Sequence, residues 1–167
     1  RDAHLMHALA AASVAKVVQF EALSLVNLAL AFARLGEPHT PLRAALAASA
    51  IPSISEFSAQ GLGNTVWAMA TLCFLHEPLL AATAVSSIKR MSEFGTQSLT
   101  NTAWSFARLS VPNRPLMKAI SSEALPKLSD FVPQEISNTA WSLAVLLLRN
   151  EPLLDSLASE ALKKIGD

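Results

Sequence analysis

The chain of 167 residues contains no tyrosine, a single cysteine and only five glycines. With one cysteine, a disulfide within the chain is impossible. No apolar run approaches the roughly 18 residues that a membrane span requires, so we expect no membrane insertion. Thirteen basic residues balance thirteen acidic ones, so no net field draws the molecule toward nucleic acid or an anionic membrane.

Motifs of catalysis are also missing. The sequence has no glycine-rich phosphate loop, no nucleophile elbow and no paired acidic motif. We therefore expect that the protein is not an enzyme, that it has no small-molecule substrate and that it needs no cofactor.

A period of 37 residues dominates what is present, and it runs through four copies without insertion or deletion. A fixed period between about 20 and 50 residues indicates a supersecondary unit that buries its apolar face only by stacking on its neighbours. Four series of residues carry the period: Phe20, Phe57, Phe94 and Phe131; Asn27, Asn64, Asn101 and Asn138; Pro41, Pro78, Pro115 and Pro152; and Trp67, Trp104 and Trp141, with Leu30 in the first copy.

Each copy reads as two helices. In the second copy, residues 58–73 lack proline and carry Leu62, Val66 and Met69 at helical spacing, which predicts a first helix, helix A. A second helix, helix B, opens at Pro78, because proline suits the first turn of a helix. The sequence therefore predicts an all-α protein, an α-solenoid of stacked helical hairpins with a 37-residue repeat.

The repeat also predicts the domain organisation, which is one continuous solenoid. Its units are an orphan second helix of a preceding repeat at 1–19 and four repeats at 20–56, 57–93, 94–130 and 131–167. Neither end has the polar outer surface of a capping repeat, so we expect other protein subunits at the uncapped ends.

Two further positions have structural interpretations. Cys73 stands where the other copies have Gly36, Ser110 and Leu147, which suggests a small buried side chain. Basic residues fall near helix C-termini, as the helix macrodipole favours: Arg34, Lys89, Arg90, Arg108, Lys127, Lys163 and Lys164.

One face of helix A is small and polar, and it lies opposite the apolar stripe. Stacked helices would align these faces in a ribbon that reads RNA, one nucleotide per repeat. Alternatively, the asparagines form a ladder between helices, and the serines and threonines are neutral fillers. The candidate RNA-binding residues are Ser24, Asn27, Arg34, Gly61, Asn64, Thr65, Thr71, Ser98, Asn101, Thr102, Ser105, Arg108, Glu135, Asn138, Thr139 and Ser142.

The tryptophans occupy a single repeat position. They would stack on bases if they were exposed. Their placement beside apolar residues favours packing between repeats.

The histidines do not indicate a metal site. His39 and His76 lie one repeat apart in the turn before helix B, so they cannot converge on one ion. His4 and His7 share a helix face but have no thiol near them in sequence. We expect no metal.

The helix A motif resembles the heptatricopeptide repeats and the related octotricopeptide repeats of algal organelles. The resemblance covers 20–167, although the first copy has Leu23 and Leu30 in place of the glutamine and tryptophan. It implies an organellar RNA-binding protein, although no RAP domain, which many such proteins carry, is recognisable in this sequence. The motif is carried by Phe94, Gln97, Leu99, Asn101, Thr102, Trp104, Ala107 and Leu109 and their counterparts.

Two functions are compatible with these features. The resemblance implies a factor of the mitochondrion or plastid that binds single-stranded RNA to stabilise, process or help translate transcripts, or that binds ribosomal RNA in an organellar ribosome. The balanced charge and uncapped ends instead fit a non-catalytic structural or adaptor subunit of a large organellar complex, which binds protein rather than RNA.

Overall fold

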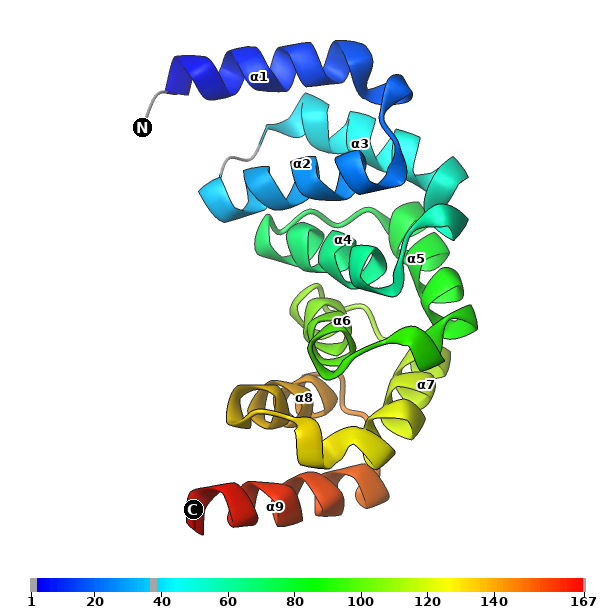
Figure 1. Cartoon of the computed structure of the whole chain (residues 1–167), viewed down its shortest axis with the longest axis vertical. Coiled ribbons are helices and arrows are strands. Elements are labelled where there is room, and N and C mark those ends of the chain that lie inside the picture. The colour runs from blue at the N-terminus through cyan, green and yellow to red at the C-terminus, as the bar shows by residue number, and fades with distance from the viewer. Residues whose placement is uncertain (1–2, 37–38, 167) are drawn as a thin grey trace.

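The computed structural model describes residues 3–36 and 39–166 (Figure 1). These residues form α-helices and short 3-10 helices, with no strand among them, so the all-α prediction is confirmed. The division into repeats stays a prediction, and residues 1, 2, 37, 38 and 167 of its units lie outside the described part. The α-helices are α1 (Ala3–Lys16), α2 (Ala22–Leu35), α3 (Thr40–Ser53), α4 (Ala59–Thr71), α5 (Glu77–Lys89), α6 (Thr96–Arg108), α7 (Arg114–Ala124), α8 (Pro133–Val145) and α9 (Glu151–Gly166).

The helices lie in two rows that curve together (Figure 1). The inner row consists of α2, α4, α6 and α8, each packed on the next. The outer row consists of α1, α3, α5 and α7, and α9 continues it by packing on the 3-10 helix η4 (Leu125–Asp130). Helices of the inner row begin at residues 22, 59, 96 and 133, and their outer partners begin at 40, 77, 114 and 151, in both cases at intervals of 37.

Side-chain caps explain where the outer helices begin. The Nδ1 atoms of His39 and His76 accept hydrogen bonds from the amides of the third residues of α3 and α5, both at 3.2 Å. Asn113 and Asn150 do the same for α7 and α9 through Oδ1, at 3.0 and 3.2 Å. Each cap satisfies one of the amides that the first turn leaves without a partner. The paired histidines are therefore helix caps.

A left-handed residue ends each inner helix. The φ angles are +68° at Gly36, +49° at Cys73, +55° at Ser110 and +52° at Leu147. At Cys73 the amide donates to the carbonyl of Ala70 and the next amide donates to that of Met69, which is the Schellman arrangement. The expectation that Cys73 is buried is wrong, because this turn directs its side chain to the surface.

Basic side chains close the other end of the second, third and fourth hairpins. Phe57 and Phe94 are buried just before inner helices. Their carbonyls accept hydrogen bonds, both 2.8 Å long, from Arg90 and Lys127. These two donors lie at the ends of the outer helices. Lys164 donates to the carbonyl of Ser129 at 3.1 Å. These cations neutralise helix ends, and they also tie the two helices of a hairpin together.

The rows curve because their contacts differ in size. Between inner helices, a Cβ atom added at Gly63 would lie 3.5 Å from the Cα of Ser98 on the next helix. The hydroxyls of Thr100 and Thr139 meet at 3.3 Å between α6 and α8. The outer row instead buries larger side chains such as Ile120. Short spacing on one side and longer spacing on the other bends the stack toward the inner row.

Candidate interaction groove

A polar groove follows the inner row and draws side chains from four successive helices. We call it the inner groove. Its lining includes Leu30 and Arg34 from α2, Asn64 and Trp67 from α4, Gln97 and Asn101 from α6, and Gln134 and Asn138 from α8. One helical row thus recurs in each inner helix, with glutamine, asparagine and tryptophan at positions i, i+4 and i+7 in α4, α6 and α8.

The asparagine amides of this row have no partners within the described residues. Asn64, Asn101 and Asn138 are half-buried, yet their side chains form no hydrogen bond there. This contrasts with Asn113 and Asn150, whose side chains cap helices. A half-buried amide offers two donors and an acceptor. The inner groove therefore presents unpaired amides at one per helix, which a ligand can satisfy.

The predicted polar face divides between the groove and the helix packing. Members that line the groove or continue its rows are Asn27, Arg34, Asn64, Asn101, Arg108, Glu135 and Asn138. Members that are buried along the inner row are Gly61, Thr65, Thr102, Ser105, Thr139 and Ser142. Ser24 is exposed on α2, whereas Thr71 and Ser98 are half-buried.

Four of the buried hydroxyls are satisfied within their own helices, whereas that of Thr139 pairs with Thr100 of the neighbouring helix. Thr65, Thr102, Ser105 and Ser142 each donate to the carbonyl four residues earlier, at 2.6 to 2.8 Å. Such side chains let neighbouring helices approach closely without leaving a polar atom unpaired. Their place in the fold is structural, and no ligand reaches them in this arrangement.

Sequence reasoning assigned the tryptophans to packing between repeats, but all three are partly exposed. Trp67 and Trp104 are half-buried, and Trp141 is 44% exposed. Trp67 lines the inner groove, and the guanidinium of Arg108 lies 5.7 Å from the ring centre of Trp104. The signal that pointed to them was their strict 37-residue spacing beside the asparagines.

The charges of the groove are few. Arg34 lines it and is exposed, and Arg108, which is also exposed, lies on the helical row that runs from Asn101 through Trp104. Glu135 accepts from the Thr96 hydroxyl at 3.2 Å and from the Val132 amide at 3.0 Å, so its carboxylate stabilises the start of α8. Elsewhere, hydrogen bonds from Lys163 and Lys164 lower the pKa of the Glu160 carboxyl, far along the chain from the groove.

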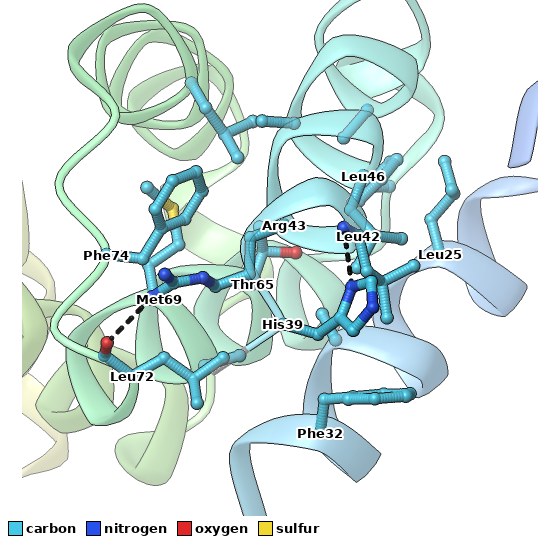
Figure 2. Close-up of a pocket in the computed structure, with 16 residues that line it drawn as sticks. Leu25, Phe32, His39, Leu42, Arg43, Leu46, Thr65, Met69, Leu72 and Phe74 are labelled. Atoms are coloured by element: carbon cyan, nitrogen blue, oxygen red, sulfur yellow. Dashed lines mark hydrogen bonds between the residues drawn. The ribbon is translucent and has the colours of Figure 1, made fainter. Parts of the chain in front are cut away.

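A second cavity lies between the first two hairpins, and its lining is mostly apolar, with His39, Arg43 and Thr65 as the polar members (Figure 2). Arg43 enters it among Leu42, Leu46 and Met69, and its guanidinium donates to the Leu72 carbonyl at 3.2 Å. The same group lies 5.1 Å from the ring centre of Phe74. These contacts hold Arg43 in the core, so we assign this cavity to packing.

Within the described residues, no cluster of three or more histidine, cysteine, aspartate or glutamate side chains has the arrangement of a metal site. None of the described helices combines the length and apolar character needed to cross a bilayer.

Comparison with known proteins gives a family. The model of a family described as RNA-editing substrate-binding complex 6 protein matches residues 1–167, which is the whole chain. No curated protein matches it. The assignment to heptatricopeptide or octotricopeptide repeats is wrong, because the match is to a different family. Small and hydroxyl residues at fixed positions are what close helix stacking requires, so that motif does not identify a single family.

Proposed function

The chain belongs to the RNA-editing substrate-binding complex 6 protein family, and from this membership we propose that it is a non-catalytic structural subunit of an RNA-editing substrate-binding complex. In this proposal the two helix rows are an α-solenoid of four 37-residue repeats. The mitochondrion is the compartment, whereas a plastid location and ribosomal RNA have no support.

The unpaired amides of the inner groove carry this proposal. Asn64, Asn101 and Asn138 each offer donors and an acceptor, and an extended polypeptide offers both kinds of group along its backbone. A phosphate backbone offers acceptors and negative charge, which call for a basic groove. Amides in a neutral groove therefore suit a segment of a partner protein.

The positions of the basic side chains outside the inner groove also favour a protein segment over RNA as its ligand. Arg43, Arg90, Lys127 and Lys164 donate to carbonyls of their own chain. The chain has only thirteen basic residues against thirteen acidic ones. Arg34 is the only basic residue among those that line the inner groove, so the described part of the chain forms no phosphate-binding track there. The tryptophans between the asparagines offer apolar faces to side chains of a peptide.

The test is retention in the native complex. A variant with Asn64→Ala, Asn101→Ala and Asn138→Ala removes the amides and keeps good helix formers, so the fold persists. We expect its yield in the purified complex to fall at least about tenfold, since each lost hydrogen bond contributes about 1 kcal/mol. Gln19→Ala, which changes an exposed amide outside the groove, is the control. Retention of the triple variant at the wild-type level contradicts the proposal.

RNA binding is the second candidate function, and a specific observation favours it. The three partly exposed tryptophans offer stacking platforms, Arg34 lines the groove and Arg108 lies on the row of Trp104. If RNA is the ligand, Arg34→Glu with Arg108→Glu abolishes binding to single-stranded RNA, and wild-type affinity falls steeply with salt. Filter binding at salt concentrations between about 50 and 200 mM measures how steeply the affinity for RNA falls with salt. A steep fall indicates RNA as the ligand, and no RNA binding leaves the protein segment.

A further inference from the structure

A pocket lies between α7 and the turn that leads from α8 into α9, and it holds about 430 Å³. Its floor consists of buried leucine and methionine side chains, and its rim carries three exposed cations. None of the described carboxylates lines it. We call it the basic pocket, and define it by Arg114, Met117, Lys118, Leu143, Leu147 and Arg149.

The basic pocket arises from two local differences from the preceding joint. α9 has its main contacts with α8 and η4, whereas α7 packs directly on α5. η4 spans six residues and α7 eleven, whereas η3 (Met91–Glu93) spans three and α5 thirteen, so less of α7 is left to meet α9. In addition, Leu143 is smaller than its counterpart Phe106, which is buried in the preceding joint. The last joint is therefore not filled by its own side chains.

The cations of the basic pocket are not needed for the fold. The guanidinium of Arg114 and the ammonium of Lys118 are exposed, and neither has a hydrogen-bond or ion-pair partner among the described residues. Arg149 forms an ion pair, 3.2 Å long, with Glu151 just outside the pocket. In the preceding joint the same three positions hold Glu77, Ala81 and Pro112. Because that joint packs with a different set of charges, these cations can serve a ligand instead.

Leu147 indicates that the ligand also has an apolar part. It lines the basic pocket and is 90% exposed. Its φ angle is +52°, in the left-handed region that disfavours residues with a Cβ atom. The equivalent turns hold smaller residues, which are Gly36, Cys73 and Ser110. Neither the backbone nor the packing of the described chain favours leucine here, whereas burial against a partner does.

A protein segment with acidic and apolar side chains has both properties. Arg114 and Lys118 are four residues apart on α7, which places them about 6 Å apart along the helix. Carboxylates on alternate residues of an extended segment are about 6.8 Å apart, so one segment can pair with both cations. RNA also offers anions, but its bases stack on aromatic rings, and no aromatic side chain of the described residues lines the pocket. The apolar floor and Leu147 therefore favour a protein segment.

The described part of this chain does not offer a suitable segment. Among the described residues, the only two carboxylates within four residues of one another are Glu151 and Asp155. Glu151 is paired with Arg149, and both carboxylates lie in the first turns of α9, where the helix macrodipole stabilises them. A second copy would have to give up these interactions to fill the pocket. Another protein is therefore the favoured source.

We propose that the basic pocket binds an acidic segment of another protein, whose carboxylates pair with Arg114 and Lys118 and whose apolar side chain packs on Leu147. No residue lines both this pocket and the inner groove. The inference rests on the proposed function only in that it expects the partner among the subunits of the same complex.

Retention in the native complex tests the charges. Arg114→Glu with Lys118→Ala installs the residues of the preceding joint, so the fold persists. We expect retention to fall at least about tenfold, because two charge-assisted contacts are lost. Lys89→Glu with Lys16→Ala makes the same change in net charge at exposed positions outside the pocket, and it should leave retention unchanged. Wild-type retention of the pocket variant overturns the inference.

Leu147→Gly tests the apolar contact with a result that partial unfolding cannot produce. Glycine relieves the left-handed strain, so the purified variant should unfold at a higher temperature than the wild type. We expect the same variant to be retained about tenfold less, because it offers no apolar surface to the bound segment. Wild-type retention of this variant overturns the inference, whatever its unfolding temperature.

A crosslink without a spacer identifies the occupant, since a carbodiimide joins an ammonium to a carboxylate only where the two are in contact. The sample is the set of assemblies purified through a tag on this chain. We expect Lys118 to be joined to an aspartate or glutamate of another protein, and we expect this product to persist after RNA is digested and to decrease in Leu147→Gly. Crosslinks of Lys118 solely to its own polypeptide or a second copy, ultraviolet crosslinks of the pocket to RNA, or no crosslink from Lys118 overturn the inference.

The two proposals fail separately in these experiments. If the protein joined to Lys118 is not a subunit of the RNA-editing complex, the proposed function fails and the basic pocket keeps its assigned ligand. If the variant without the groove asparagines loses retention and the basic-pocket variants do not, the proposed function stands and the inference about the basic pocket is wrong.

Discussion

The inner and outer rows share one period but differ in chemistry. Inner helices meet through glycine, alanine, serine and threonine, and outer helices meet through larger side chains such as Met117 and Ile120. Contacts between small side chains set the distance between inner helices. Contacts between large side chains bury more apolar area per residue. The difference suggests that the small inner contacts set the shape of the groove, while large apolar side chains of both rows, such as Leu99 and Ile120, supply most of the stability.

Truncation of a large side chain in the outer row should have the largest effect on the free energy of unfolding. Ile120 is 1% exposed, so Ile120→Ala removes buried methylene groups and leaves a cavity, at a cost of about 2–5 kcal/mol in the free energy of unfolding. On the inner row, Thr102→Ala removes a hydroxyl bonded within its own helix and one buried methyl group, and should cost about 1–2 kcal/mol. Urea denaturation measures both. Equal losses would contradict the division of roles.

Enlarging a side chain between two inner helices should have the second largest effect on stability. Gly63→Leu forces a side chain against the backbone of Ser98, and we expect a loss of about 1–3 kcal/mol. Gly63→Ala is the matched control, because its Cβ would lie at ordinary contact distance, 3.5 Å, and alanine favours the helix by about 1 kcal/mol. Thermal unfolding followed by circular dichroism separates the two. A stable leucine variant would show that the inner spacing is adjustable.

The outer helix caps offer a test in which the chain supplies its own control. His76→Ala removes the acceptor at the start of α5 and should cost about 0.5–2 kcal/mol. His76→Asn installs the residue that already caps α7 and α9, so it should be neutral. The measurement is the midpoint of denaturant unfolding at neutral pH. A loss in both variants would mean that the imidazole contributes by contacts other than its cap.

The smallest effect should come from the inner helix ends. Leu147 is 90% exposed and has a positive φ, so Leu147→Gly loses little burial and should stabilise the protein by up to about 1 kcal/mol. Gly36→Ala, at the equivalent turn, should destabilise it by a similar amount, about 1 kcal/mol. Differential scanning calorimetry of the pair checks the sign. A shift in the same direction for both would contradict the left-handed requirement.

Much of the helical pattern could be predicted from the sequence, since local chemistry decides it. Pro78 lies in the first turn of α5 as expected, and the apolar stripe containing Leu62 and Val66 is buried. The polar face was harder, because serine and threonine suit both a solvent-facing helix and a close helix contact. Thr102 and Asn101 are adjacent in sequence, yet one is buried between helices and the other faces the groove.

The remaining differences have similar physical causes. Cys73 was expected to be buried from its size, but a backbone angle determines its position. The tryptophans have both an apolar ring and a polar edge, so their spacing alone could not show that they are partly exposed. Ile165 is as apolar as Leu128, its counterpart 37 positions earlier, so the sequence could not show that the first is 81% exposed and the second is buried.

The hydroxyl bonds of the buried inner side chains have a mechanical consequence. Thr65, Ser105 and Ser142 bond within their own helices, so these side chains add no hydrogen bond between neighbouring helices. Small rotations at successive joints therefore break few bonds, and they add up along the stack. We therefore expect a partner bound along several helices to change the curvature of the whole stack by small rotations at each joint.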